Sequence, residues 1–584
     1  MSITRRTFLK RTSLCISAAA AAPALINAAT AAQKQNILFI AIDDLNDWIG
    51  CLGGHSQAMT PNIDRLARQG MLFTNAHCAV PVCGPSRGCV FTGRQPWNTG
   101  LFTNDNTALE QIGREFPTLM QTLIQSGYNT YGAGKLLHGS MKHYPDDLFT
   151  DFGPPYQKWL PFTDEETRYT DEEYNSPVDK SLLTHEVNRG PGKLNVTFPL
   201  NNMPRERRLG SRRIDSFDWG GLPVTDSEMG DYITSDWCIQ QLKQPQDKPF
   251  FLGVGIYRPH IPLFVPQKYY DMYPPDKVQL PKVLENDLAD LSPVARDLAL
   301  QAYTAGSHQN VVEHGQWREA VSCYLACITF IDAQIGRVLE ALEKSPYRDN
   351  TSIILWSDHG WHLGEKEHWG KFAGWEESTR VPLIIVPAKK EADQYATGKR
   401  CAKPVSLIDL YPTVLELTGR QADHPLDGKS LLPLLKNPDA DFKDHIITTF
   451  GRGNHTIRTD RWRYIHYYDG SEELYDLEQD PNEFTNLADD VKFDAVKNFL
   501  AQKIPDYANV RHFVSMGTWK AVLRHDDSKT ELFHFEDNKA VPEKENVAAA
   551  HPEIIRVMYD YIQKNNISEK YLSIPDGWFN KNRP

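Results

Sequence analysis

Beyond its first 32 residues, this sequence of 584 residues lacks any apolar run of the roughly 18 residues that a membrane-spanning helix needs. Its 37 glycines and 38 prolines show no collagen-like period and no low-complexity bias. Hydrophobic residues make up 41% of the chain and charged residues 24%, which is typical of a globular protein and excludes general disorder. The sequence therefore predicts a folded chain with no membrane span.

Positive charge is also scarce. The 63 lysines and arginines are outnumbered by 75 acidic residues, which gives a formal net charge of −12. The first 32 residues contain four basic residues and no acidic one, so the rest of the chain is more negative still. Such a surface repels a phosphate backbone, and we expect no nucleic-acid partner. A small anionic substrate would need a local cluster of positive side chains.

Cysteine is sparse as well. The sequence has nine cysteines, of which Cys15 lies in the first 32 residues. The other eight are too few for a disulfide-dense scaffold, and no Cys/His spacing typical of a zinc site occurs. If one of the eight has a chemical role, an odd number is left, so the remainder cannot all pair internally.

The first residues have the composition of a targeting signal. Residues 4–10 contain three basic residues, and an Ala-rich apolar stretch follows over residues 14–32. The paired Arg5 and Arg6 resemble those of a bacterial twin-arginine signal, which exports folded proteins. A Sec signal or an uncleaved anchor is the alternative. We expect residues 1–32 to be a twin-arginine-like signal peptide and the protein to be exported, either periplasmic or secreted.

Short apolar segments alternate with helix-like segments in the first two thirds of the chain, which indicates an α/β fold with a mostly parallel sheet. We expect strands at residues 36–42, 128–132, 249–257, 351–356 and 382–386, and helices at residues 61–69, 117–126, 320–343 and 407–417. Residues 140–223 are rich in Asp, Pro, Tyr and Arg and have weak periodicity, which is typical of a loop-rich insertion that lines a substrate cleft.

The pattern changes after about Leu435. Residues 461–478 and 518–536 each alternate as antiparallel strands do, and a helix-like stretch follows each of them. Either a hairpin-plus-helix unit is duplicated in tandem, or two amphipathic hairpins are alike by chance. We predict a catalytic domain at residues 33–440 and a smaller C-terminal α+β domain with antiparallel sheet at residues 441–584.

Polar residues follow four of the predicted strands directly. In strand order they are Asp43 and Asp44, Lys135 and His138, His260, and Asp358 and His359. Ligands bind beyond the carboxyl ends of the strands in open α/β sheets, so we expect these residues to form one site. An isolated Asp-Asp pair is usually a helix cap or a solvated turn. The third carboxylate, Asp358, instead favours a site for a hard divalent cation.

The most specific motif is Cys83-Gly84-Pro85-Ser86-Arg87, followed by Thr92-Gly93-Arg94. It resembles the signature of the type I, formylglycine-dependent sulfatases of the alkaline-phosphatase-like superfamily. Further strings resemble the iduronate-2-sulfatase subgroup of that family, and they lie at residues 134–138, 258–262, 358–365, 369–372, 381–384, 409–413 and 457–460. The resemblance covers essentially the whole chain after the signal.

This resemblance implies a large mixed, mostly parallel sheet sandwiched by helices, and it implies two additions to the chain. A formylglycine-generating maturation enzyme would oxidise Cys83 to formylglycine, an aldehyde whose hydrated form is a gem-diol nucleophile. One Ca²⁺ per chain would activate that nucleophile. Its ligands would be Asp43, Asp44, Asp358, His359 and the modified Cys83.

The resemblance also implies a role for each further catalytic residue. Arg87 would orient the diol, and Lys135 and Lys371 would bind the sulfate group. His260 would donate a proton to the leaving alcohol, and His138 would take a proton from the remaining hydroxyl so that sulfate is expelled.

The function that follows is hydrolysis of a sulfate ester in a sulfated oligosaccharide, with the 2-O-sulfate of a uronic acid as the expected target. Two alternatives come from other classes. One is a phosphonate monoester hydrolase or phosphodiesterase with the same fold. The other is a non-catalytic exported glycan-binding protein, which would hold if Cys83 stays unmodified.

Overall fold

The computed structural model describes most of the chain after the expected signal, which itself lies outside the described residues. The described residues are 35–104, 109–163, 166, 184–188, 194–204, 216–300, 306–451, 453–505, 510–516, 519–524, 531–534, 548, 551–564 and 572–574. Within them, no helix is long and apolar enough to cross a membrane.

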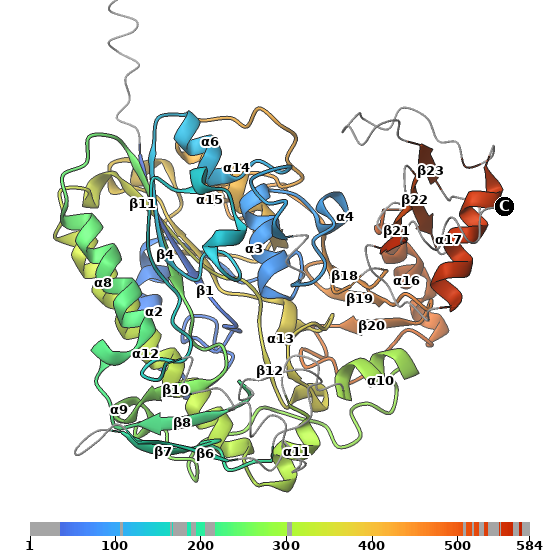
Figure 1. Cartoon of the computed structure of the whole chain (residues 1–584), viewed down its shortest axis with the longest axis horizontal. Coiled ribbons are helices and arrows are strands. Elements are labelled where there is room, and N and C mark those ends of the chain that lie inside the picture. The colour runs from blue at the N-terminus through green and yellow to red at the C-terminus, as the bar shows by residue number, and fades with distance from the viewer. Residues whose placement is uncertain are drawn as a thin grey trace, which may run out of the picture.

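A sheet of eight described strands forms the centre of the molecule (Figure 1). In spatial order the strands are β15 (Lys399–Cys401), β2 (Met71–Phe73), β14 (Leu383–Val386), β11 (Thr351–Ser357), β1 (Asn36–Ile42), β9 (Phe250–Ile256), β4 (Asn129–Gly134) and β5 (Asp151–Pro155). Within this sheet, β14 runs antiparallel to both neighbours and the other pairs are parallel. The predicted mixed, mostly parallel sheet is confirmed.

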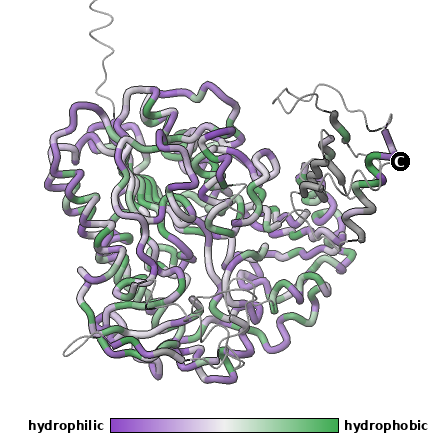
Figure 2. The backbone as a smooth tube through the Cα atoms, in the orientation of Figure 1, coloured by the Kyte–Doolittle hydropathy of each residue, from purple (hydrophilic) through white to green (hydrophobic). Residues whose placement is uncertain are grey.

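Strand β1 lies in the middle of the sheet and is buried on both faces because all seven of its residues except Asn36 are apolar. Successive side chains of a strand point to opposite faces. The odd-numbered apolar residues of β1 share a core with α3 (Cys83–Thr92), α6 (Leu119–Gln125), α14 (Leu410–Leu417) and α15 (Leu432–Lys436). The even-numbered ones share a core with α2 (Pro61–Gln69), α8 (Gly230–Lys243) and α12 (Trp317–Glu343). Helices therefore cover both faces, and Figure 2 shows the hydrophobic residues concentrated along the central strands.

The register of the central strands brings their carboxyl ends to one edge. Ile42 at the end of β1 pairs with Ser357 at the end of β11 and with Ile256 at the end of β9. Gly134 at the end of β4 pairs with Gly255 of β9. The chain segments that follow these four strands therefore start close together.

The region at residues 140–223, which was predicted to be a loop-rich insertion, contains one strand of the main sheet. Residues 151–155 form β5, an edge strand of the main sheet that pairs in parallel with β4. Its sequence, Asp-Phe-Gly-Pro-Pro, has no strand pattern. Proline has no N–H group to donate, so it is tolerated mainly at a sheet edge, where one side of the strand has no neighbour. The other described strands of this region are β6 (His185–Asn188), β7 (Asn195–Phe198) and β8 (Trp219–Leu222), and β8 pairs with β10 (Leu263–Pro266).

The C-terminal part contains two further four-stranded sheets of described strands (Figure 1). The first is β17 (Ile446–Thr449), β18 (His455–Arg458), β19 (Trp462–His466) and β20 (Glu472–Asp476), followed by α16 (Asp494–Ala501). The second is, in spatial order, β23 (Glu531–His534), β22 (Trp519–Arg524), β21 (Val510–Met516) and β24 (Leu572–Ile574). Helix α17 (Pro552–Lys564) lies between β23 and β24 in the chain. Both predicted hairpins are antiparallel, and a helix follows each.

Short elements complete the described fold. They are β3 (Ala76–His77), α4 (Pro96–Thr99), α9 (Gln267–Tyr270), α10 (Pro293–Leu300), α11 (His308–Glu313), β12 (His362–Leu363), β13 (Trp369–Gly370), α13 (Glu376–Thr379) and β16 (Val405–Ser406).

The fully buried Arg463 of β19 ion-pairs with Glu376 of α13 and, at 2.6 Å, with Glu483. The first C-terminal sheet is thus fastened to the main body by buried charge.

A tight approach between β9 and β4 gives a test of this packing. A Cβ atom at Gly255 would lie 2.3 Å from the carbonyl carbon and 2.4 Å from the backbone nitrogen of Lys135. Because backbone cannot swing aside, Gly255→Ala should lower the free energy of unfolding by about 1–3 kcal/mol, measured by urea denaturation. Gly220→Ala is the control, since the atoms nearest to its Cβ would be side-chain atoms of Leu200, the nearest at 3.2 Å. Equal stability of the two variants would contradict the packing.

Candidate functional site

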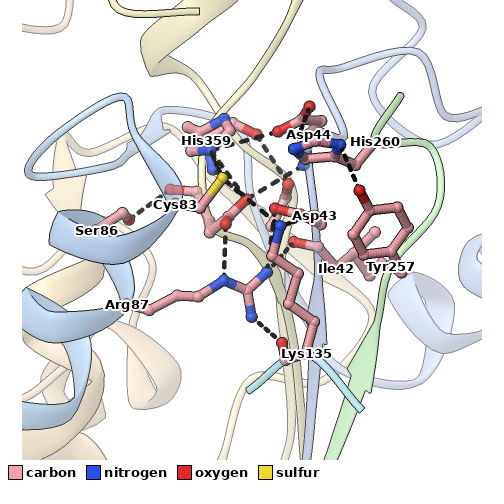
Figure 3. Close-up of polar contacts among 12 residues, drawn as sticks. Ile42, Asp43, Asp44, Cys83, Ser86, Arg87, Lys135, Tyr257, His260 and His359 are labelled. Carbon is pink, nitrogen blue, oxygen red and sulfur yellow. Dashed lines mark hydrogen bonds and ion pairs between the residues drawn. The ribbon is translucent and has the colours of Figure 1, made fainter. Parts of the chain in front are cut away.

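The predicted site residues gather at the carboxyl edge of the sheet (Figure 3). Cys83 is the first residue of α3, and its sulfur faces the ends of β1 and β11. Hydrogen bonds, ion pairs or close polar contacts join all the predicted residues except His138 into one cluster, in which every member is buried except the partly exposed His260. The joined residues are Asp43, Asp44, Cys83, Arg87, Lys135, His260, Asp358, His359 and Lys371.

Three carboxylates lie at the centre of the cluster, and all three are fully buried. Asp358 Oδ1 accepts hydrogen bonds from the backbone N–H of Asp44 at 3.2 Å and of His359 at 3.0 Å. Its Oδ2 accepts from Arg87 Nε at 2.8 Å. Asp358 therefore fixes the two chain segments that carry the other ligand candidates.

The segment after β1 turns sharply at Asp44, which has a φ of +58°. Such a left-handed backbone is uncommon for a residue with a side chain, although Asp tolerates it better than most residues do. The Tyr324 hydroxyl donates to the Asp44 carbonyl oxygen at 2.7 Å and accepts from Asn46 N–H at 3.1 Å. The Ser357 hydroxyl accepts from Leu45 N–H at 3.0 Å. These two hydroxyls hold the turn that points the Asp44 side chain into the site.

Arg87 connects the strand ends beneath the cluster. Besides Asp358, its guanidinium reaches Asp43 Oδ1 at 3.5 Å and donates to the backbone carbonyl oxygens of Lys135 and of Leu136. Its side chain is fully buried, and its contacts bridge the segments that follow β1, β4 and β11. In this structure Arg87 acts on the carboxylates and the backbone, with no hydrogen bond to Cys83.

Two buried lysines supply positive charge next to the sulfur of Cys83. Lys371 Nζ lies 2.9 Å from Sγ and 2.6 Å from Asp44 Oδ1. Lys135 Nζ lies 3.7 Å from Sγ and ion-pairs with Asp43. Burial works against the charged form of each lysine, but the carboxylates outweigh it and raise the pKa of both. Both lysines are therefore cationic at neutral pH.

The cluster also has the donor set of a cation site. One potential ligand atom from each of Asp43, Asp44, Cys83 and His359 lies within 4.8 Å of the others. Asp44 Oδ2 is buried and has no hydrogen-bond partner among the described residues. Burial, reinforced by the charge of Asp43, raises the pKa of Asp44 to about 7 in spite of Lys371. An unpartnered carboxylate oxygen held among other carboxylates fits a hard divalent cation.

His359 has the orientation that a ligand needs. Its Nδ1 lies 3.0 Å from the Gly360 carbonyl oxygen, so Nδ1 carries the hydrogen and Nε2 keeps its lone pair. Nε2 faces Cys83 Sγ and Asp44 Oδ1, each at 3.4 Å. Burial lowers the pKa of this imidazole, which keeps it neutral. The hydrogen bond of Nδ1 thus directs Nε2 of His359 towards the cluster.

The other two histidines flank the cluster. His260 Nε2 lies 3.8 Å from Asp44 Oδ2, and burial together with Lys135 and Lys371 holds the pKa of His260 well below its usual range. Burial, with Lys135 adding to it, lowers the pKa of His138 to about 3. His138 Nδ1 is buried and has no hydrogen-bond partner in the described part of the chain. Both rings are neutral and hold a lone pair for a proton.

Reasoning from the sequence missed three hydroxyl groups of the site. Tyr324 and Ser357 brace the turn at Asp44, and Tyr257 contacts His260 through its hydroxyl (Figure 3). Ser357 and Tyr257 were within reach of a sequence argument, because each lies at or directly after the end of a predicted strand. Tyr324 was not, since it lies inside a long buried helix, where tyrosine is an ordinary core residue.

Comparisons with known proteins agree with this geometry. The profile of the Sulfatase family matches residues 35–420, and that of the C-terminal part of N-sulphoglucosamine sulphohydrolase matches residues 364–509. A sulfatase from Formosa agariphila is 36% identical over 482 residues, which cover 81% of this chain and 87% of that protein. Human iduronate 2-sulfatase is 29% identical over 417 residues, 68% of each chain. A phosphonate monoester hydrolase from Silicibacter pomeroyi has the same fold, with a TM-score of 0.62 at 22% identity over 81% of this chain and 94% of its own.

The carboxylate cluster predicts that a divalent cation stabilises the folded protein. Adding excess Ca²⁺ to chelator-treated protein should raise the midpoint of thermal unfolding, since a ligand at 100 times its Kd adds about 2.7 kcal/mol. Asp44→Ala should abolish the increase. Asp423→Asn should keep it, because that carboxylate is 80% exposed and far from the cluster in the chain. No increase in the unaltered protein with Ca²⁺, Mg²⁺ or Mn²⁺ would contradict a cation site.

Proposed function

This chain belongs to the sulfatase family, and we propose that it removes the 2-O-sulfate from a uronic acid of a sulfated oligosaccharide. As a member of this family it is a sulfuric ester hydrolase. The observation that carries the proposal is the pair of buried lysines within 3.7 Å of Cys83 Sγ, next to the carboxylate cluster. Support for the 2-O-sulfated uronate comes from the similarity to human iduronate 2-sulfatase, which extends over 417 residues.

Cys83 is the residue that we expect to be converted to formylglycine. As a thiol it is a poor nucleophile, because burial and then the charge of Asp43 raise its pKa. Its Sγ marks the place of the oxygen that would replace it, beside Lys371 and His359. When present, the hydrated aldehyde supplies the attacking oxygen and a divalent cation supplies the charge that activates it. Asp43, Asp44, Asp358 and His359 would hold that cation.

Lys135 and Lys371 bind the sulfate group in this proposal. A sulfate ester carries its negative charge on the non-bridging oxygens, and two ammonium groups around the position of Sγ neutralise that charge where sulfur is attacked. The lysines are held by Asp43 and Asp44, so they need no rearrangement when substrate enters. They also supply the local positive charge that an acidic protein needs for an anionic substrate.

The two histidines move protons in the proposed reaction. His260 Nε2 faces the cluster and is assigned to the oxygen of the departing alcohol, which needs a proton as the S–O bond breaks. His138 is neutral and follows Lys135 by three residues, and we assign it as the base that restores the site when sulfate leaves. Arg87 keeps the carboxylates in place throughout.

The rest of the chain fits an exported enzyme with two parts. We propose that residues 1–32 are a twin-arginine-like signal and that the protein acts in the periplasm or outside the cell. Export in the folded state lets a maturation enzyme modify Cys83 before the protein leaves the cytoplasm. Residues 33–440 form the proposed catalytic domain, with substrate-cleft segments from residues 140–223, and residues 441–584 form the proposed C-terminal domain.

The substrate assignment is tested by sulfate release. The protein, produced with a formylglycine-generating enzyme, should release sulfate from an unsaturated disaccharide that is 2-O-sulfated on the uronic acid. It should release none from the 6-O-sulfated isomer. Phenyl sulfate should be hydrolysed with a higher kcat/KM than a phenyl phosphonate ester, because both lysines serve a sulfate group. Faster hydrolysis of the phosphonate would favour the hydrolase alternative, and inactivity on every 2-O-sulfated uronate would contradict the proposal.

A further inference from the structure

Tyr257 is held rigidly at the end of β9, beside His260. Its backbone N–H donates to Asp231 Oδ1 at 2.6 Å, and its side chain is 3% exposed. Its ring stacks on Tyr156 at a centroid distance of 5.4 Å and an interplanar angle of 9°. Lys135 Nζ lies 4.8 Å from the centre of the Tyr257 ring. The phenol therefore has one fixed position in the wall of the site.

The Tyr257 hydroxyl, the Ile261 carbonyl oxygen and His260 Nδ1 form a triangle of hydrogen bonds. The hydroxyl donates to Ile261 O at 2.9 Å and lies 2.9 Å from His260 Nδ1 (Figure 3). His260 Nδ1 lies 2.6 Å from the same carbonyl oxygen. A carbonyl oxygen only accepts hydrogen bonds, and the single phenolic hydrogen already points to it. Nδ1 must therefore carry a hydrogen, because two lone pairs at 2.6 Å would repel.

This triangle fixes which nitrogen of His260 is free. With the hydrogen on Nδ1, Nε2 is the atom that gains and loses a proton. Nε2 faces the carboxylate cluster, 3.8 Å from Asp44 Oδ2. A ring turned over about its Cβ–Cγ bond would lose both bonds to Tyr257 and Ile261. Those bonds thus select the tautomer and the orientation together.

We propose that Tyr257 is a positioning residue for the leaving-group step, and that its hydroxyl keeps His260 Nε2 aimed at the ester oxygen. This inference rests on the proposed sulfatase reaction. In that step sulfur gains a bond to the attacking oxygen and loses its bond to the ester oxygen. The electron pair of the broken bond stays on the ester oxygen, which takes the proton that the neutral ring has accepted at Nε2 from the attacking hydroxyl. Nδ1 keeps its hydrogen, which remains shared with the hydroxyl and the carbonyl.

The substitution Tyr257→Phe isolates the hydroxyl. Phenylalanine keeps the ring that stacks on Tyr156 and lies beside Lys135, so the sulfate-binding lysine retains its aromatic neighbour. Tyr411→Phe is the matched control. Tyr411 is also fully buried, but it belongs to α14, and its hydroxyl hydrogen-bonds outside the cluster, to Thr122 at 2.7 Å and to His424 at 3.4 Å.

The readout is the dependence of kcat on the leaving group. 4-Nitrophenolate leaves without help from an acid, whereas phenolate and a sugar alkoxide need a proton. Tyr257→Phe should lower kcat for phenyl sulfate by about 10-fold or more and for 4-nitrophenyl sulfate by less than about 3-fold. His260→Asn should show a larger effect with the same selectivity. The double variant should match His260→Asn, because residues that act through one group are not additive. Tyr411→Phe should match the unaltered enzyme on both esters.

The outcomes separate this inference from the proposed function. Equal losses on both esters, or additive losses in the double variant, would overturn the positioning role while leaving the sulfatase reaction intact. An unaltered, fully modified enzyme that hydrolyses neither ester would overturn the proposed function, and the inference with it.

Discussion

The repulsion among three buried carboxylates is the constraint on which the rest of the site depends. Asp43, Asp44 and Asp358 lie together because the register of β1 and β11 brings the ends of those strands side by side. Such a cluster is stable only with compensating positive charge. Arg87, Lys135 and Lys371 provide it, and Asp44 Oδ2, which has no hydrogen-bond partner among the described residues, offers an oxygen to a cation. The charge of the three carboxylates thus accounts for the buried arginine, the two lysines and the place for a cation.

The same balance explains how an acidic protein can act on an anionic ester. Lys135 and Lys371 are each held by a carboxylate and each approach the sulfur of Cys83, so their charge is available to a sulfate group without being exposed at the surface. Burial keeps these ammonium groups from being screened by solvent. The negative net charge of the chain therefore repels large polyanions, while Lys135 and Lys371 provide the positive charge next to Cys83.

The sequence predicted the elements that begin or run in a distinctive way, such as β1 with its continuous apolar residues and α2 with its N-terminal proline, and it placed the polar residues at the correct strand ends. It did not reveal β5, whose prolines and glycine disguise an edge strand. Lys371 came from the family resemblance alone, since it follows a two-residue strand that no pattern indicates. Tyr324 lies 280 residues from Asp44 in the chain, and only folding brings its hydroxyl to that turn. Local sequence pattern thus predicts which residues lie at the site, whereas hydrogen bonds between distant parts of the chain determine how those residues are oriented.

Cys83 is the proposed precursor of the reactive group, and its modification can be checked on a single peptide. The direct measurement is mass spectrometry of the tryptic peptide that contains Cys83, from protein produced with and without a formylglycine-generating enzyme. We predict that the peptide carries the aldehyde or its hydrate when the maturation enzyme is present, and that sulfate release rises in proportion to the modified fraction. A peptide that retains the thiol in fully active protein would contradict the account.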